Sequence, residues 1–195
     1  MAQSLGPFSL ERMVRAVERV RERLLLATAG LENASIPYAV CGGNAVAVWV
    51  TRVDESAVRN TRGVDTLIRR SDLDAVKAAL SAAGFDNKHT ADLDLFLDSP
   101  SARPRDAVHI IFAGEKVRPE ELLPNPDVTE SVPSEQFRVL DLEALVRIKL
   151  TAYRDKDRTH LRDLLDVGLI DGSWCGRYPA ELAARLRALV DTPDG

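Results

Sequence analysis

The sequence predicts an α+β fold: a mixed β-sheet flanked by helices and followed by a C-terminal helical unit. Helical and strand patterns alternate from residue 9 to residue 112, four prolines then fall between residues 118 and 134, and only helical patterns follow. Alternation of this kind is typical of a sheet covered by helices. Because the chain has 195 residues, of which 45% are hydrophobic, it is long enough to bury a core.

The first element is a long amphipathic helix at residues 9–33, where apolar side chains recur at helical spacing with Glu and Arg between them. The patterns after it predict, in order, a strand at 36–41, a buried helix at 44–50, a strand at 64–68, a helix from 71 to 84, and strands at 92–97 and 107–112. Ser71 and Asp72 suit the start of the second of these helices, and Gly84 suits its end.

These elements divide the chain into four segments. The segments are an N-terminal helix packed on the core at 1–34, an α/β core at 35–118, a proline-rich surface linker at 119–138 and a C-terminal helical unit at 139–195. The last segment is expected to contain helices at 141–154, 159–167 and 179–190.

The net charge and the hydropathy of the chain exclude some classes of function. The net charge of −4 is spread along the chain and Lys and Arg form no single basic block, so binding in a DNA groove is not expected. No apolar run reaches the roughly 20 residues that span a membrane, and residues 1–6 lack a basic segment followed by an apolar one. The sequence therefore predicts a cytoplasmic protein without a membrane partner.

A pair of glycines, Gly42 and Gly43, lies where a predicted strand runs into the predicted helix that Asn44 opens. The first N–H groups of a helix have no partner within it and point toward whatever anion lies there. The pair therefore predicts an anion-binding turn. The alternative is a tight turn that only joins the strand to the helix.

Asp65 lies in the predicted central strand at 64–68. A buried carboxylate without a partner is costly, so Asp65 has either a chemical task or an ion-pair partner, which would be Arg59 or Arg62. Alternate residues of a strand share a face, so a second carboxylate for the same site would stand at position 63. The sequence has Gly63 there.

Three motifs in the chain together resemble a known family. They are Gly42-Gly43 opening a helix, the pattern Arg59-x-Thr61-x-x-Val64-Asp65, and a helix that carries Lys149 followed by Arg154, Lys156, Asp157 and Asp163. The combination resembles the nucleotidyltransferase superfamily, and within it the minimal and AbiEii-toxin-like proteins. The resemblance runs from Ile36 to Asp163 and implies a nucleotidyltransferase-like mixed sheet.

The resemblance also implies a site for a nucleoside triphosphate and a divalent metal, Mg²⁺ or Mn²⁺. Asp65 would be the catalytic residue and a metal ligand. The residues that would bind the nucleotide are Gly42, Gly43, Asn44, Arg59, Thr61 and Lys149. In such a site, two cations about 3.5–4 Å apart assist the attack of a hydroxyl on the α-phosphorus.

Two of the three carboxylates that the family uses are replaced in this chain. Gly63 stands in place of one, and His109, on the predicted strand 107–112, stands in place of another. Mg²⁺ prefers oxygen ligands, so one aspartate and one histidine should hold it poorly. A softer metal such as manganese or zinc suits ligation by Asp65 and His109 better. The alternative is that His109 is a hydrogen-bonded core histidine.

Lys149 occupies a position in the apolar stripe of the predicted helix 141–154. An ammonium group there needs an anion, and the resemblance implies the phosphates of a bound nucleotide. The alternative is a lysine whose stem covers the core while its charge reaches water.

Asp92 and Asp94 form another acidic pair with i, i+2 spacing and are a rival metal site. The leucines that alternate with them also fit a strand at the sheet edge with one wet face. The structural interpretation is the favoured one.

Two hypotheses about function follow. The first is binding of a nucleoside triphosphate with a divalent metal and transfer of a nucleotidyl group to an unknown acceptor, which could be a protein, an RNA end or a small molecule. The second is a catalytically inactive relative that keeps the fold as a binding or regulatory module, as toxin and antitoxin proteins do. Asp65 and Lys149 favour the first, whereas Gly63 and His109 favour the second. The sequence does not set the oligomeric state.

Overall fold

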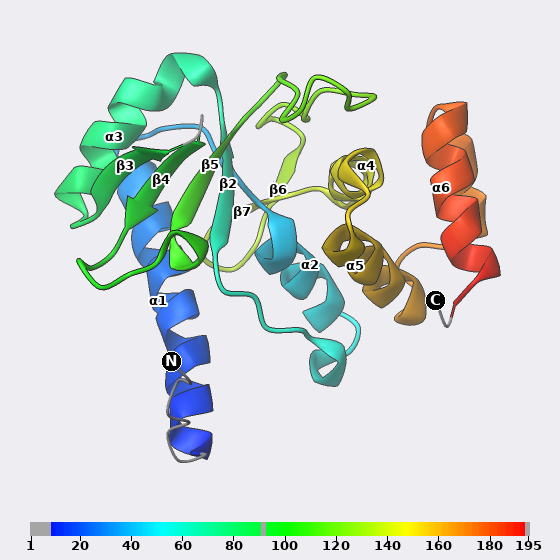
Figure 1. Cartoon of the computed structure of the whole chain (residues 1–195), viewed down its shortest axis with the longest axis horizontal. Coiled ribbons are helices and arrows are strands. Elements are labelled where there is room, and N and C mark those ends of the chain that lie inside the picture. The colour runs from blue at the N-terminus through cyan, green and yellow to red at the C-terminus, as the bar shows by residue number, and fades with distance from the viewer. Residues whose placement is uncertain (1–8, 91–92, 194–195) are drawn as a thin grey trace, which may run out of the picture.

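The computed structural model describes residues 9–90 and 93–193, which form a seven-stranded mixed sheet with helices on both faces (Figure 1). This architecture confirms the predicted α+β fold. The strands are β1 Ala39–Cys41, β2 Val64–Ile68, β3 Asp86–Thr90, β4 Leu93–Leu97, β5 Val108–Phe112, β6 Ser131–Pro133 and β7 Arg138–Leu140. The helices are α1 Leu10–Asn33, α2 Gly42–Thr51, α3 Leu73–Ala82, α4 Leu142–Ala152, α5 Asp155–Asp166 and α6 Ala180–Asp191.

The strand order across the sheet is β3-β4-β5-β2-β1-β7-β6. The central strand β2 pairs antiparallel with β1 and parallel with β5. The register sets Cys41 beside Asp65, and Asp65 beside His109. Because residues that are paired across neighbouring strands point to the same side of a sheet, these three side chains form a row on one face.

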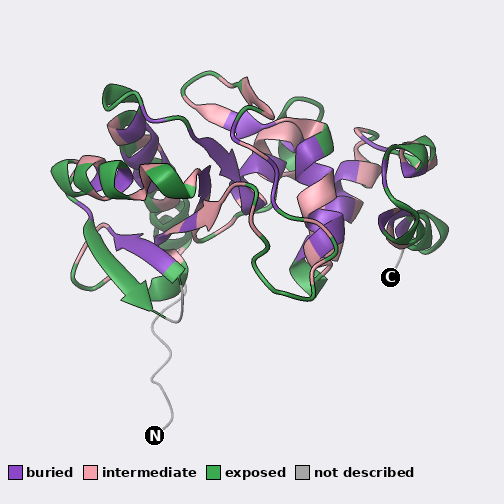
Figure 2. Ribbon diagram, turned by 90° about the horizontal axis from the view of Figure 1, so that it is seen from above, coloured by how far each residue is buried: buried purple, intermediate pink, exposed green. Residues whose placement is uncertain are grey.

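The two faces of the sheet are covered by different helices. Helices α1 and α3 pack on one face, where Val64 and Ile68 of β2 are buried, whereas α2, α4 and α5 surround Leu67 on the other (Figure 1). Asp65 alternates with Val64 and therefore lies on the Leu67 face. Figure 2 shows that the helices nearest this face carry long buried stretches, while α6 lies farther out, against α4 and α5. The row of polar side chains thus faces the C-terminal helices.

The β3–β4 hairpin differs from the expectation. Strand β3 contains no apolar residue and is exposed throughout, so no alternation of apolar and polar residues predicts it from the sequence. Because β3 is present, β4 lies between β3 and β5, and Leu95, Phe96 and Leu97 are all buried. The expectation of an edge strand with one wet face at 92–97 is therefore wrong.

The proline-rich segment 119–138 also contributes to the sheet. It contains β6, and β7 begins at its end. Strand β7 pairs parallel with β1 through Val139 and Val40, and β6 forms the edge of the sheet. An edge strand can end in Pro133, because the N–H that proline lacks is not needed for a further strand. The chain here extends the sheet as well as crossing the surface.

Helix α1 packs on the sheet only through its C-terminal half, where Leu24, Ala27 and Leu31 are buried. Its N-terminal end projects beyond the sheet, and Leu10 and Met13 are exposed there (Figure 1). Neither α1 nor any other helix within the described ranges is both long and apolar enough to cross a membrane.

Candidate functional site

The chain turns from β1 into α2 at Gly42, whose φ of +65° lies in the left-handed region that favours glycine. A Cβ atom added to Gly42 would lie 1.9 Å from Oδ2 of Asp65. No side chain fits in that space, so the backbone of the turn lies directly against the carboxylate. The predicted turn and the predicted acid are therefore neighbours.

Gly43, the next residue of the turn, faces two other polar side chains. A Cβ atom on Gly43 would lie 3.0 Å from Oγ1 of Thr61 and 3.5 Å from Cε1 of His160. Thr61 comes from the loop before β2, and His160 comes from α5. The structure thus brings together Gly42, Gly43, Thr61 and Asp65 of the predicted site.

Asp65 and His109 form a pair across β2 and β5. Nδ1 of His109 lies 3.3 Å from Oδ1 of Asp65, and its Nε2 lies 2.7 Å from the carbonyl oxygen of Pro104. The hydrogen bond to Asp65 raises the pKa of His109 although burial opposes this shift. Burial favours a higher pKa for Asp65, but the hydrogen bond and charge of His109 outweigh it and lower the pKa of that carboxyl.

The ring of His109 occupies the space that a side chain at position 63 would need. A Cβ atom on Gly63 would lie 2.9 Å from Cε1 of His109, 3.1 Å from its Nδ1 and 3.2 Å from the carbonyl oxygen of Arg105. The two departures from the family pattern are therefore one structural unit: the glycine makes room for the histidine.

Two predicted nucleotide-binding residues have partners within the chain. Asn44 is buried, and its Nδ2 donates to the carbonyl oxygen of Gly63 at 2.8 Å, which ties the start of α2 to the approach to β2. Arg59 pairs with Asp163 of α5 at 2.7 Å. The interpretation of Arg59 as the ion-pair partner of Asp65 is therefore not supported, because His109 is that partner.

Lys149 lies on α4 with only 5% of its side chain exposed, so its charge does not reach water as a snorkelling lysine would. Its Nζ lies 3.0 Å from Oδ1 of Asp157, whose Oδ2 accepts from Nε of Arg154 at 2.7 Å. Asp157 is fully buried. Two cations share one carboxylate in this cluster, so its three side chains together carry one net positive charge.

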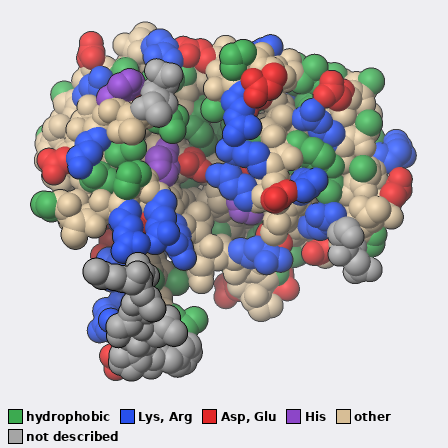
Figure 3. All heavy atoms as spheres, in the orientation of Figure 1, with side chains coloured by type: hydrophobic (Ala, Val, Ile, Leu, Met, Phe, Trp, Pro, Cys, Tyr) green, Lys and Arg blue, Asp and Glu red, His purple; other side chains and the backbone are tan. Residues whose placement is uncertain are grey.

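The cations of α4 and α5 lie near Asp65. After the effect of His109, the charges of Lys149 and Lys156 are among the influences that lower the pKa of Asp65. Lys156 is exposed at the start of α5. Figure 3 shows a histidine and an acidic side chain side by side on the sheet half of the molecule, facing a column of basic side chains on the helical half. An anion between them would meet positive charge from α5.

No protein-family model and no curated protein matches the chain, but solved structures do. An antigenic nucleotidyltransferase-like protein from Paracoccidioides brasiliensis matches with a TM-score of 0.60 at 16% identity, over 91% of this chain and 89% of the other. The antibiotic-resistance factor ANT(2″)-Ia in solution matches with a TM-score of 0.52 at 15% identity, over 93% and 92%. The fold is nucleotidyltransferase-like. ANT(2″)-Ia in complex with adenylyl-2″-tobramycin gives a TM-score of 0.52 at 15% identity, over 91% and 99%.

The donor set in this nucleotidyltransferase-like fold does not fit a resident divalent metal. A second carboxylate at position 63 would collide with the ring of His109. Asp65 is the one carboxylate of the pair, and both ring nitrogens of His109 already face oxygen atoms of Pro104 and Asp65. Across residues 9–90 and 93–193, no group of three or more His, Cys, Asp or Glu side chains is arranged to hold a metal ion.

The acidic pair Asp92 and Asp94 is the alternative candidate for a metal site. Asp92 lies outside the described residues. Oδ1 of Asp94 is 3.4 Å from Nδ1 of His89 and 3.6 Å from Nζ of Lys77, so this buried carboxylate is paired with the lysine and lies beside the histidine. The structure supports the structural interpretation of Asp94.

Sequence reasoning missed His160. Burial, followed by the charge of Lys149, lowers the pKa of His160 to about 4, so its ring is neutral at pH 7. Its Nδ1 is buried and has no hydrogen-bond partner among the described residues. In the structure His160 follows Lys156 by four residues on α5, so the two side chains share a face, whereas the helix predicted at 159–167 leaves Lys156 outside it.

Proposed function

We propose that the chain binds a nucleoside triphosphate at the Gly42 turn and transfers its nucleotidyl group to the hydroxyl of an acceptor. The observation that carries the proposal is the contact between the turn and Asp65, with the cations of α4 and α5 nearby. Backbone N–H groups of the turn would bind phosphate, and Asp65 would accept a proton beside it. The fold supports this proposal, since ANT(2″)-Ia, a protein of similar fold, was solved with an adenylylated antibiotic.

The binding free energy would come mainly from side-chain charge. The N-terminus of a helix such as α2 stabilises an anion by about 0.3–1 kcal/mol. A charge-assisted hydrogen bond from a cation such as Lys156 or Arg154 adds about 1.5–3 kcal/mol. Three such bonds together with the helix reach the roughly 8 kcal/mol of micromolar binding. The cations therefore decide the affinity, and Gly42 and Gly43 decide where the phosphates lie.

The transfer step is a displacement at the α-phosphorus. The acceptor oxygen forms a bond to that phosphorus, the bond to the oxygen bridging to the β-phosphate breaks, and pyrophosphate leaves. Asp65 takes the proton of the acceptor hydroxyl. Because the pair with His109 lowers the pKa of Asp65 despite burial, this carboxylate is a weak base at neutral pH, and we expect slow transfer.

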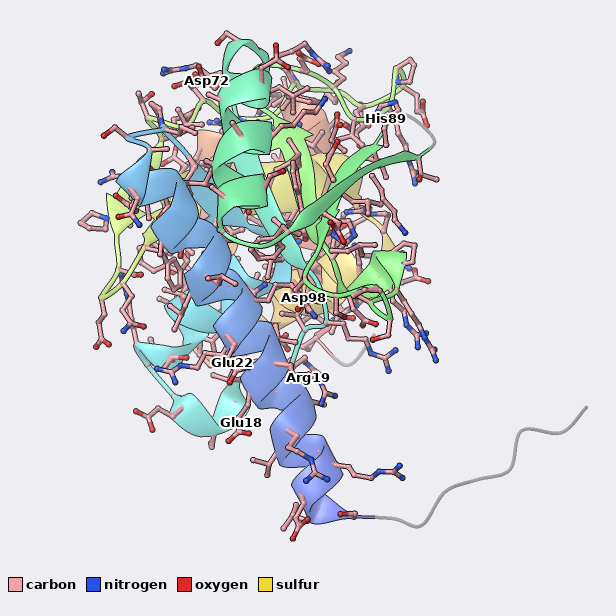
Figure 4. All side chains as sticks on the ribbon, turned by 90° about the vertical axis from the view of Figure 1, so that its left-hand side faces the viewer. Glu18, Arg19, Glu22, Asp72, His89 and Asp98 are labelled. Atoms are coloured by element: carbon pink, nitrogen blue, oxygen red, sulfur yellow. The ribbon has the colours of Figure 1, made fainter. Side chains whose placement is uncertain are left out.

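A groove beside the turn offers a place for the acceptor. It has a volume of about 1380 Å³ and runs between α1 and the loops at 60–62 and 98–106. Thr61 lines the groove and also lies against Gly43, so this residue lies between the groove and the turn. Its walls include the labelled residues of Figure 4 along α1 and the facing loop, namely Glu18, Arg19, Glu22 and Asp98. Walls with both signs of charge suit a polar acceptor.

A second candidate function is a catalytically inactive binding or regulatory module, of the toxin and antitoxin kind. The observation that favours it is the Gly63–His109 unit, which leaves Asp65 without the neighbouring carboxylates that the family resemblance implies. Such a module would bind the nucleotide and release no pyrophosphate.

Binding is tested by thermal shift with ATP, CTP, GTP and UTP, followed by calorimetry on the best ligand. Lys156→Ala should weaken binding by about tenfold, which corresponds to the loss of about 1.4 kcal/mol. Lys88→Ala, which removes an exposed lysine of β3, is the matched control and should leave the affinity unchanged. If none of the four nucleotides stabilises the protein, with or without Mg²⁺, the proposed function fails.

Transfer is tested by pyrophosphate release with aminoglycosides, tRNA and mixed proteins as acceptor pools. Asp65→Asn should slow release by about 10²–10⁴-fold while nucleotide binding is kept, because only the proton acceptor is lost. Asp74→Asn, an exposed acid of α3, serves as the control. Release that is equally fast in Asp65→Asn would contradict the role of Asp65. Binding without release in every pool would favour the inactive module.

A further inference from the structure

The hydrogen bonds of His109 define its protonation. Nε2 faces a carbonyl oxygen, that of Pro104, at 2.7 Å, and Nδ1 faces a carboxylate oxygen of Asp65 at 3.3 Å. Both groups only accept hydrogen bonds, so Nε2 donates to Pro104, and Nδ1 donates to Asp65 when it carries a proton. A ring that donates from both nitrogens is an imidazolium cation. The contact with Asp65 therefore favours the positively charged form of His109, in line with its raised pKa.

This cation lies where a metal-based site would need its second carboxylate. A Cβ atom at position 63 would lie 2.9 Å from the ring of His109 and 3.2 Å from a backbone oxygen, so a carboxylate at 63 would force the ring out of its present position. The ring could move away only by losing its contacts with Asp65 and with the carbonyl oxygen of Pro104.

We propose that His109 takes the place of a divalent cation at Asp65, so that the site accepts a nucleoside triphosphate free of metal. The identity of this ligand rests on the proposed function. The replacement of the metal rests on the packing of Gly63 against His109 and on the contacts of the His109 ring.

The surrounding charges favour such a ligand. Asp65 and His109 neutralise each other, as do Arg59 and Asp163. The cluster of Lys149, Arg154 and Asp157 keeps one positive charge, and Lys156 adds another. A bare divalent cation would be repelled by this excess, whereas a polyphosphate would be attracted to it.

A restored site provides the sharpest test of the replacement. The double variant Gly63→Asp, His109→Asp removes the ring and supplies carboxylates at both positions. Titration with Mn²⁺ alone, followed by electron paramagnetic resonance, should show at least about tenfold tighter binding to the double variant than to the parent. Gly176→Asp adds a carboxylate where a Cβ atom meets nothing within 4 Å, and it should behave as the parent does. Equal Mn²⁺ affinity in the parent and the double variant would overturn the replacement.

The protonation of His109 has its own readout. Nitrogen-15 spectra of the histidine rings at pH 7, with His109 identified through His109→Gln, should show both ring nitrogens protonated. A bare nitrogen on that ring would overturn the proposal even if the double variant failed to fold.

The ligand is tested by calorimetry with the best nucleoside triphosphate in EDTA and in Mg²⁺. The parent should bind with dissociation constants that agree within about twofold. Binding only in Mg²⁺ would overturn the metal-free ligand and leave the proposed function intact. Binding under neither condition would defeat the proposed function, and the Mn²⁺ and nitrogen-15 results would still decide the role of His109.

Discussion

Two aspartate–histidine pairs span neighbouring strands of this sheet, and their surroundings differ in nearly every respect. Asp65 and His109 are paired in register across β2 and β5 with 3.3 Å between Oδ1 and Nδ1, and Asp94 and His89 are paired across β4 and β3 with 3.4 Å between the same atoms. The first pair lies at the centre of the sheet. The second lies in the outermost hairpin, and Figure 4 shows His89 near its tip.

An aspartate–histidine pair alone therefore does not identify a functional site. The side chain of His89 is 61% exposed, and Lys77 gives Asp94 a second partner. The side chain of His109 is 25% exposed and is fixed by Pro104 on its other nitrogen. The central pair differs in having two glycines against it: Gly42 brings backbone against Asp65, and Gly63 makes room for the ring of His109. The charges of Lys149 and Lys156 also act on Asp65. The comparison teaches that a site is recognised by what surrounds the charged groups.

The largest expected effect comes from filling the space beside Asp65. Gly42→Ala and Gly84→Ala impose alanine on the same left-handed backbone region, at φ +65° and +90°. Only Gly42 faces Asp65, whereas Gly84 has nothing within 4 Å. The backbone cost is about 1–2 kcal/mol for each, and overpacking adds about 1–3 kcal/mol at Gly42 alone. Urea unfolding measures both variants, and equal losses would mean that the turn does not press on Asp65.

A smaller effect separates the two histidines. His109→Ala should lower the free energy of unfolding by about 1–3 kcal/mol, because it leaves the carboxylate of Asp65 without its partner in a part-buried place. His89→Ala should change it by no more than about 0.5 kcal/mol, since that side chain is mostly exposed and Lys77 remains. Chemical denaturation of the two variants compares them directly. Similar losses would remove the distinction between the centre and the edge.

The central site was partly visible in the sequence. The strand at 64–68 lies where its pattern predicts it, and the glycine turn follows from a strand that meets a helix. Gly63 and His109 were each recognised as departures from the family pattern, but their complementarity was not. It depends on the parallel pairing of β2 with β5, and no local pattern encodes which strands pair.

The edge was the harder part to predict. Strand β3 has no apolar residue, and β6 and β7 are three residues long. None of the three therefore has an alternating apolar pattern from which a strand could be predicted. Lys149 was correctly recognised as a charge in an apolar stripe. Its partner Asp157 could not be assigned, because that contact joins two helices whose packing is set by tertiary structure.

The smallest expected effect concerns a third histidine, which lacks a carboxylate partner and so sharpens the contrast. Burial and then Lys149 lower the pKa of His160 from its ordinary 6.5 to about 4. Below pH 6.5 the unfolded chain therefore binds a proton at this histidine, whereas the folded protein binds one only near pH 4. The free energy of unfolding consequently falls as the pH is lowered from 6.5 to 4. The melting temperature of the parent should drop more between pH 7 and pH 4.5 than that of His160→Gln, by a few degrees. Scanning calorimetry at both pH values measures the two drops, and parallel curves would contradict the prediction. A difference would mean that burial and the charge of Lys149 keep His160 neutral in the folded protein, in contrast to His109, whose pKa is raised by its contact with Asp65.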